Sequence, residues 1–162
     1  MRHIAYAVLI VLLATQLWAR PIRVLATGDM HGWLQVQRVG EEYLGGAGEM
    51  LAHWRKAEGY RPERFLVLSG GDIATGPVLA TALKGDPVVA VMNIMGYDAS
   101  AAGNHEFDFG QQKLRAWAQV ARFPFLAANL VNEDGSPTDL VRRYQVFDAE
   151  GVKVAVVGLT TS

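Results

Sequence analysis

The sequence contains no cysteine. Thiolate zinc sites, thiol nucleophiles, disulfide bonds and dithiol redox chemistry are therefore excluded. A lipid anchor attached through cysteine is excluded for the same reason. A domain built from these residues must be stabilised by its apolar core or by a bound metal ion.

An excess of charge of either sign is also missing. Lysine and arginine number 15 against 16 aspartate and glutamate residues, which gives a net charge of −1. Nothing in that balance attracts a nucleic-acid polymer or an anionic membrane surface. The apolar share of 51% is that of a globular protein, and 162 residues suffice for one domain rather than two. The oligomeric state stays open at this point.

No apolar run reaches the roughly 20 residues of a membrane-spanning helix. The longest run, at residues 4–17, follows a basic start at Met1–His3 and is followed closely by the small residue Ala19. This layout is typical of a secretory signal peptide, and a membrane anchor is the competing interpretation. The pattern predicts a signal peptide at residues 1–19, cleaved near Ala19, and export to the periplasm or the extracellular space without a stable membrane anchor.

After this segment, β-branched runs alternate with helical patterns, which predicts an α/β fold. Strands are expected at residues 22–27, 65–68, 99–102, 125–130, 143–148 and 152–159, and helices at residues 45–58, 77–83, 87–95 and 111–121. The run at 22–27 is apolar on both faces and is therefore predicted to be a central strand. The last two strands are expected to form a hairpin.

The final strand also predicts an incomplete domain. Residues 152–159 form an apolar run that needs cover on both faces, yet only three residues follow it. A domain of this class rarely ends on such a strand. We therefore expect residues 20–162 to form the first part of a domain, interrupted before its end.

Polar side chains follow three of the expected strands. Asp29 and His31 come after the first strand, Asp72 after the second, and Asn104 with His105 after the third. Because ligand sites of open α/β sheets gather at the carboxyl ends of strands, these loops are expected to converge. Oxygen and imidazole donors without sulfur suit zinc, manganese, iron or similar divalent ions. Each motif alone has an ordinary interpretation as a turn, but their order and spacing favour a metal site.

At this point the chain resembles a known family. The motifs are those of the calcineurin-like metallophosphoesterase superfamily, and more narrowly of its secreted 5′-nucleotidases. The resemblance extends over nearly the whole chain after the signal peptide, through residues 28–32, 70–76, 93–98, 103–110, 128–130 and 157–161. It implies a layered αββα sandwich, of which this chain would supply the first part.

The resemblance also implies roles for individual residues. Asp29 and His31 would bind a first divalent metal ion, Asp72 would bridge two ions, and Asn104 would bind the second. His105 would contact the phosphoryl group and stabilise the transition state, while Asp108 would orient and polarise His105. Two ions about 3.5–4 Å apart activate water and clamp the attacking and leaving oxygens.

The chain departs from the family pattern in two ways. Gly28 stands where the family usually has asparagine, which changes a loop but no ligand. The family's further histidine ligands have no counterpart among the four histidines of the sequence. His3 lies in the predicted signal peptide, and His53 is expected on a helix away from the strand ends. The family's C-terminal domain, whose aromatic residues give nucleoside specificity, is also missing.

Several other residues attract attention. Glu106 is expected to support its loop through hydrogen bonds rather than to bind metal. Trp33 and Tyr43 either line a substrate mouth or pack in the core, and Trp54 and Trp117 are expected in the core.

The resemblance implies hydrolysis of phosphate monoesters, with a small-molecule nucleotide as substrate and two divalent ions such as zinc or manganese as cofactors. Two alternatives remain open. One is a different hydrolase on the same scaffold, acting on cyclic nucleotides, UDP-sugars or sulfur esters. The other is a non-catalytic protein that binds a metal or a nucleotide.

Overall fold

The computed structural model describes residues 21–161. The predicted signal peptide at residues 1–19 lies outside this range, so its cleavage stays a prediction. Within residues 21–161, no helix has the length and apolar character needed to cross a membrane.

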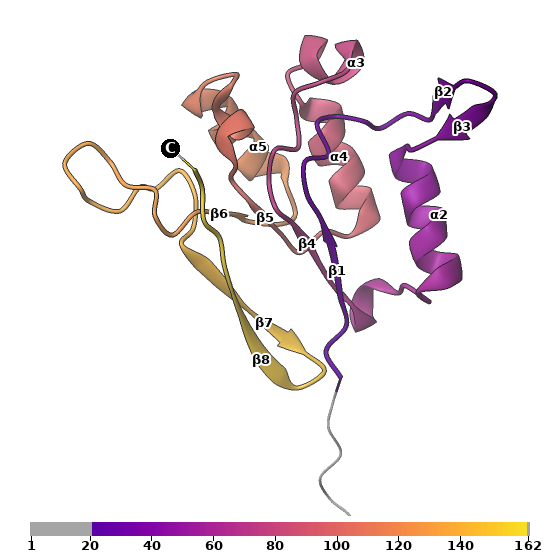
Figure 1. Cartoon of the computed structure of the whole chain (residues 1–162). Coiled ribbons are helices and arrows are strands. Elements are labelled where there is room, and N and C mark those ends of the chain that lie inside the picture. The colour runs from indigo at the N-terminus through magenta and orange to yellow at the C-terminus, as the bar shows by residue number, and fades with distance from the viewer. Residues whose placement is uncertain (1–20, 162) are drawn as a thin grey trace, which may run out of the picture.

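A parallel sheet of four strands forms the centre of the fold, in the order β1-β4-β5-β6 (Figure 1). The strands are β1 (Val24–Thr27), β4 (Leu66–Ser69), β5 (Ala99–Ala101) and β6 (Phe125–Leu126). The connections carry α2 (Ala47–Ala57), α3 (Val78–Ala82), α4 (Asp86–Met95) and α5 (Gln111–Val120). Because parallel neighbours need such crossovers, all four strands end at the same edge of the sheet. The predicted alternation of strands and helices is confirmed.

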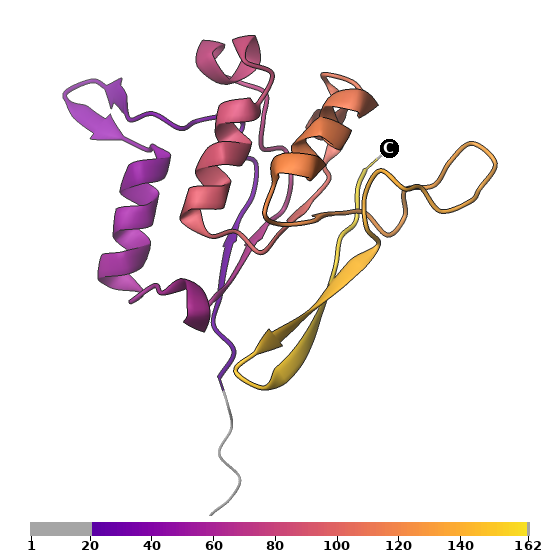
Figure 2. The same ribbon diagram turned by 180° about the vertical axis from the view of Figure 1, so that it is seen from behind.

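The helices lie on one face of the sheet. Figure 2 shows α4 and α5 in front of the strands, and Figure 1, from the opposite side, shows the strands in front. The core lies between these helices and the sheet; its most deeply buried side chains include Val67, Val88, Val89, Met92, Leu114, Trp117 and Phe125. Trp54 and Trp117 are both buried, as predicted. The α/β layering is thereby confirmed.

Helix α4 shows how local sequence sets the ends of an element. Gly85 precedes it in the left-handed conformation with φ 75°, and Pro87 occupies its first turn. Gly96, with φ 81°, ends the helix and donates its N–H to the carbonyl of Met92 at 3.1 Å. Proline has its φ preset for a first turn, and glycine adopts the left-handed conformation without a steric cost.

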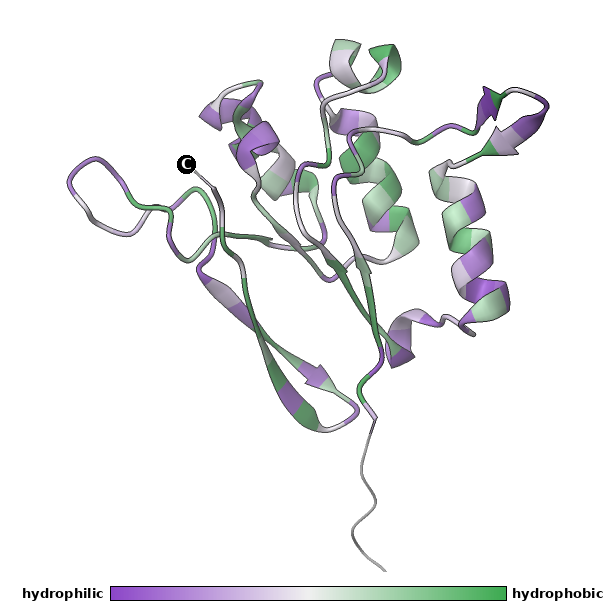
Figure 3. Ribbon diagram, viewed as in Figure 1, coloured by the Kyte–Doolittle hydropathy of each residue, from purple (hydrophilic) through white to green (hydrophobic). Residues whose placement is uncertain are grey.

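For the described residues, the prediction that the first strand is central is wrong. Among residues 21–161, β1 pairs only with β4, and Val24 is 49% exposed. Figure 3 shows that β1 and β4 are nevertheless apolar along their length. An apolar strand pattern indicates that both faces of the strand are shielded from water. The number of neighbouring strands depends instead on backbone hydrogen bonds. The sequence pattern does not encode that second property.

The end of the chain differs in part from the prediction. The expected hairpin is confirmed as β7 (Tyr144–Ala149) paired with β8 (Val152–Val157). In β8, half-buried and exposed residues alternate, so the expected burial on both faces is wrong for the described residues. β6 is also shorter than expected, because Ala127 donates its N–H to the carbonyl of Arg142 and Ala128 donates to that of Gly158.

Four short elements were not predicted. β2 (Gln37–Val39) and β3 (Glu42–Leu44) form an exposed hairpin between β1 and α2. Two 3₁₀ helices, η2 (Pro62–Arg64) and η3 (Asn104–Phe107), precede β4 and follow β5. The residues of η3 belong to the third candidate motif, so this turn shapes the site.

Candidate active site

Three loops meet at the edge of the sheet where the strands end. The loop after β1 runs beside the loop after β4, since the N–H of His31 donates to the carbonyl of Asp72 at 2.9 Å and that of Gly32 to the carbonyl of Ile73 at 2.7 Å. The N–H of Asp29 also donates to the carbonyl of Gly71, at 3.2 Å. These bonds continue the β1–β4 pairing past the strand ends and place His31 next to Asp72.

The backbone is strained at three of the predicted ligands. Asp29, His31 and Asp72 have φ values of 49°, 44° and 54°, in the left-handed region that side chains other than glycine rarely adopt. Each such residue costs on the order of 1 kcal/mol. Left-handed residues cluster at functional sites, where surrounding bonds hold them, and the bonds between the first two loops do so here.

The buried side chain of Glu106 connects the loop after β4 with the loop after β5. Its side chain is 0% exposed, and its carboxylate accepts the backbone N–H groups of Asp72 at 3.0 Å, Ile73 at 2.8 Å and Gly103. Burial raises the pKa of Glu106, while the three N–H donors oppose that rise. One buried carboxylate therefore holds both loops in register, which confirms the supporting role predicted for Glu106.

Asp72 approaches the third loop closely. Its Oδ1 accepts the backbone N–H of His105 at 3.0 Å. A Cβ placed on Gly103 would collide with Oδ1 and Cγ of Asp72. The absence of a side chain at Gly103 is therefore what lets the carboxylate lie against η3.

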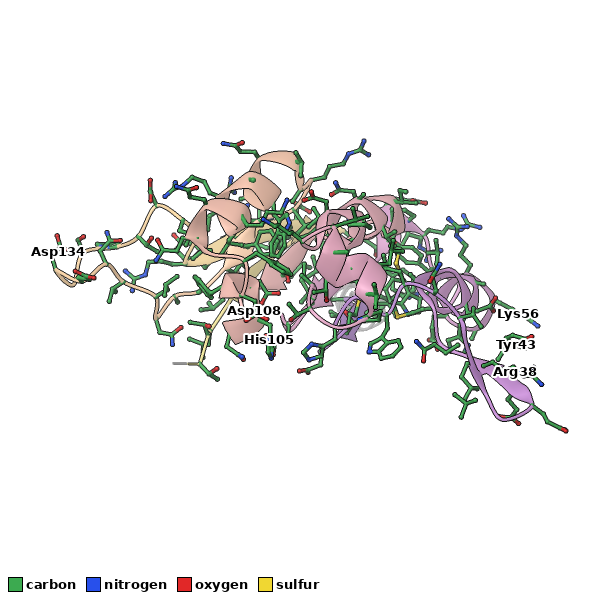
Figure 4. The ribbon with its side chains drawn as sticks, turned by 90° about the horizontal axis from the view of Figure 1, so that it is seen from above. Arg38, Tyr43, Lys56, His105, Asp108 and Asp134 are labelled. Carbon is green, nitrogen blue, oxygen red and sulfur yellow. The ribbon has the colours of Figure 1, made fainter. Side chains whose placement is uncertain are left out.

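Both histidines use Nδ1 for a hydrogen bond that fixes the ring. Nδ1–H of His31 donates to the carbonyl of Thr75 at 2.9 Å, and Nδ1–H of His105 donates to Oδ2 of Asp108 at 2.8 Å. A histidine whose Nδ1 donates in this way keeps the lone pair of Nε2 available in its neutral form. Figure 4 shows His105 and Asp108 side by side.

The pair of His105 and Asp108 shifts the pKa of both groups. The hydrogen bond to Asp108 raises the pKa of His105, and the same bond lowers the pKa of Asp108. Neither side chain is deeply buried, so water screens part of the interaction. The pair favours a protonated His105 at higher pH than for a free imidazole.

The two rings face one another across the loops. The centroids of His31 and His105 are 5.1 Å apart, with an interplanar angle of 70°. One ligand atom from each of His31, Asp72 and His105 lies within 4.8 Å of the others. Nε2 of His31 is also 3.8 Å from Oδ1 of Asp29, whose side chain is 76% exposed. Imidazole and carboxylate donors at such spacing fit a divalent ion.

No protein-family model matches the chain. Protein UshA of Yersinia enterocolitica is 39% identical over 140 residues, which are 86% of this chain and 25% of the relative. A 5′-nucleotidase of Vibrio vulnificus is 35% identical over 151 residues, which are 91% of this chain and 27% of the relative. The crystal structure of a 5′-nucleotidase precursor from Thermus thermophilus matches with a TM-score of 0.75 at 30% identity, over 86% of this chain and 28% of that one. This chain is a homologue of the 5′-nucleotidases.

The homologue spans about a quarter of the length of the curated relatives it matches. Its fold is also that of a calcineurin-like phosphoesterase, YfkN from Bacillus subtilis, with a TM-score of 0.64 at 23% identity over 86% of this chain and 48% of that one. The resemblance stated from the motifs is therefore confirmed, together with the fold class.

In this 5′-nucleotidase homologue, four of the six predicted site residues lie together: His31, Asp72, His105 and Asp108. Asp29 lies beside this group, because its Oδ1 is 3.8 Å from Nε2 of His31. Asn104 is exposed and begins η3, directly before His105. Their roles as ligands or catalytic groups stay predictions.

Other features of the site had no counterpart in the prediction. Thr75 orients His31 through its backbone carbonyl. Every residue type has such a carbonyl, so the sequence could not mark Thr75 as part of the site. Tyr97 donates its OH to Sδ of Met30 at 3.2 Å and lies 2.9 Å from Oγ1 of Thr27, which supports the loop after β1 from the core. Trp33 and Tyr43 are exposed, so core packing is wrong for both.

Proposed function

We propose that this protein hydrolyses phosphate monoesters of nucleotides, with two divalent metal ions as cofactors. The observation that carries the proposal is the convergence of His31, Asp72 and His105, with His105 hydrogen-bonded to Asp108. The identity to proteins named 5′-nucleotidase supports the substrate class. The net charge of −1 favours a small-molecule substrate over a nucleic-acid polymer.

In this proposal, Asp29 and His31 hold one ion, Asp72 bridges both, and Asn104 holds the second. Bound divalent ions supply an activated water and a clamp on the attacking and leaving oxygens. The donor set agrees with this role, because carboxylate, amide and imidazole groups suit zinc, manganese or similar ions.

The proposed catalytic pair is His105 with Asp108. Because Nδ1–H is bonded to Asp108, Nε2 of His105 is the ring nitrogen outside that bond, and in a protonated ring it would donate to a phosphoryl oxygen as negative charge develops. Asp108 holds the ring in orientation and stabilises its protonated form. Glu106 stays beneath both loops and takes no part in proton transfer.

We also propose that residues 20–162 form the N-terminal part of a calcineurin-like metallophosphoesterase domain, exported by a signal peptide at residues 1–19. The basic start and short apolar run of the sequence support export. N-terminal sequencing of the protein recovered from a periplasmic or culture fraction tests it, and an N-terminus at Met1 would contradict cleavage.

Hydrolysis assays on the product of the full reading frame test the activity. AMP, a UDP-sugar and a 2′,3′-cyclic nucleotide are compared with and without manganese or zinc. Fastest turnover of AMP, dependent on metal, supports the proposal, whereas preference for another substrate indicates a different hydrolase on the same scaffold.

Two variants and one control make the assay specific. Asp72→Ala is expected to remove metal occupancy and activity together, while His105→Ala should lower kcat. His53→Ala serves as the control, because His53 is an exposed histidine on α2. Retained activity in Asp72→Ala contradicts the assignment.

A further inference from the structure

Trp33 differs from the other tryptophans that the structure describes. Trp54 and Trp117 are buried, whereas Trp33 is 48% exposed. Other large apolar side chains in the same short segment are exposed as well: Val36, Val39, Tyr43 and Leu44. Single exposed apolar residues are ordinary, but a group of them on one segment marks a binding surface. Trp33 therefore belongs to a candidate binding surface.

Trp33 lines an open groove together with residues of the β2–β3 hairpin. The walls of the groove also include Gln35, Gln37, Val39, Leu44 and Gly46, and its volume is about 230 Å³. None of the residues that line it is charged. Sites for whole small molecules usually have roughly 300–1,000 Å³, so this groove suits a single ring system.

One face of the hairpin lines the groove. Because side chains alternate between the two faces of a strand, Gln37, Val39 and Leu44 share a face. Arg38 and Tyr43, which pair with each other, lie on the opposite face and do not line the groove. Figure 4 shows both at the outer end of the hairpin. Tyr43 is thus an exposed aromatic residue of the same hairpin that lies outside the groove.

The backbone holds the two walls of the groove together. The carbonyl of Leu34 accepts the N–H of Ala47 at 3.0 Å, which joins the segment before the hairpin to the start of α2. A Cβ placed on Gly46 would lie 2.9 Å from the backbone nitrogen of Val36, so the segments before and after the hairpin are packed closely. The groove is therefore formed before any ligand binds.

The groove begins beside the candidate active site. The N–H of Trp33 donates to the carbonyl of Met30 at 2.9 Å, which closes a turn around His31 and Gly32. Trp33 follows His31 by two residues, and two residues of chain span at most about 7 Å. In a nucleotide, a single ribose separates the phosphate from the base. A nucleotide whose phosphate lies at His31 therefore has its base within reach of Trp33.

We propose that this groove binds the base of the nucleotide substrate, with the base stacked on Trp33. The inference rests on the proposed function for the position of the phosphate. The uncharged aromatic and aliphatic walls suit the flat faces of a base, and the side-chain amides of Gln35 and Gln37 offer donors and acceptors for its edge. Because stacking tolerates every base, the groove accepts purines and pyrimidines and disfavours phosphate esters without an aromatic ring.

Binding of adenosine to the purified 162-residue chain in EDTA tests the groove, because adenosine has no phosphate and EDTA removes bound metal. In saturation-transfer NMR, the base protons of adenosine should receive more saturation than the ribose protons. Trp33→Ala should raise the dissociation constant by about fivefold or more, as expected for the loss of one stacking aromatic side chain.

Two further variants make the binding test specific. Trp33→Phe keeps an aromatic face and should bind adenosine more tightly than Trp33→Ala. The matched control Tyr43→Ala, on the opposite face of the hairpin, should bind as the parent chain does. Circular dichroism of each variant checks that the fold is intact. Failure of the parent chain to bind adenosine, or equal binding by Trp33→Ala, overturns the inference.

Kinetics on the product of the full reading frame separate this inference from the proposed function. Trp33→Ala should raise KM for AMP by a similar factor and leave kcat unchanged, whereas KM for ribose 5-phosphate, which lacks a base, should stay the same. Adenosine binding that depends on Trp33 in a protein without phosphatase activity supports the groove and refutes the proposed function. AMP hydrolysis with an unchanged KM in Trp33→Ala refutes the groove and leaves the proposed function intact.

Discussion

The buried carboxylate of Glu106 accepts the backbone N–H of Ile73 at 2.8 Å, although the two residues are 33 positions apart. Two more N–H groups, from Asp72 and Gly103, bind the same carboxylate. These bonds tie the loop that carries Asp72 to the loop that carries the His105–Asp108 pair. Both loops are therefore positioned by one buried carboxylate that accepts backbone N–H groups from each of them.

Glu106→Ala is expected to destabilise the fold strongly. It leaves three N–H groups without their acceptor, and each buried unsatisfied donor costs roughly 1–3 kcal/mol. Urea unfolding should therefore show a loss on the order of 3 kcal/mol or more in the free energy of unfolding. Glu106→Gln, which keeps an acceptor oxygen, should lose less. The exposed Glu41→Ala is the matched control, and an equal loss in Glu41→Ala and Glu106→Ala would contradict the role of Glu106.

Asp108→Asn is expected to lower the pKa of His105. The hydrogen bond to Asp108 is the main cause of its raised pKa, and an amide cannot stabilise the imidazolium in the same way. An NMR titration of the ring protons in EDTA measures the change, with the resonances of His53 as an internal reference. The same midpoint for His105 in both proteins would show that Asp108 is not the cause.

The pair also makes stability depend on pH. Because the pKa of His105 is higher in the folded protein than in the unfolded chain, its contribution is complete below about pH 6.5 and is lost as the pH rises through the folded value. The lowered pKa of Asp108 acts in the other direction, since its contribution is present above about pH 3.9 and is lost as the pH falls through the folded value. Asp108→Asn should flatten both slopes in unfolding experiments run across this range.

Gly103→Ala is expected to weaken metal binding. The added Cβ would push the carboxylate of Asp72 away from η3, and a displaced ligand should raise the dissociation constant for zinc by about tenfold or more. Gly48→Ala is the control, because a Cβ at Gly48 in α2 meets no atom within 4 Å. That variant should bind zinc normally and gain up to about 1 kcal/mol in stability. Normal zinc binding by Gly103→Ala would argue against the close packing of Asp72.

Tyr97→Phe is expected to lower the free energy of unfolding by about 1 kcal/mol, because it removes the hydrogen bonds to Thr27 and Met30 from a buried position. Burial raises the pKa of Tyr97 to about 12. Burial also raises the pKa of Tyr60, so spectrophotometric titration of the parent protein should show both Tyr60 and Tyr97 among the tyrosines that ionise late. The late absorbance change should be smaller by one tyrosine in Tyr97→Phe, and an unchanged amplitude would contradict the raised pKa of Tyr97.

The chemistry of the site follows from the sequence because it depends on residue types at the ends of recognisable strands. Asp29, His31, Asp72 and His105 each follow an apolar run, and parallel strands end at a common edge. The convergence of three loops is thus already implied by local pattern and chain order. The two ends of α4 are also set by local sequence, because Gly85 and Gly96 adopt the left-handed conformation there themselves.

Other features depend on distant parts of the chain. Within residues 21–161, backbone pairing leaves β1 at an edge of the sheet, and the apolar pattern of its side chains does not specify that pairing. The short strands β2 and β3 are wholly exposed, so no burial pattern marks them.

The sequence by itself determined the set of donor groups, the order of the longer strands and helices, and the family resemblance. Only the tertiary structure decided which atoms those groups present: Nδ1 of His31 is bound to the carbonyl of Thr75, and Asp72 lies against η3 because Gly103 leaves room for it. The physical reason is that residue type decides what a side chain offers, whereas backbone carbonyls and N–H groups, which are alike at almost every position, decide how it is held.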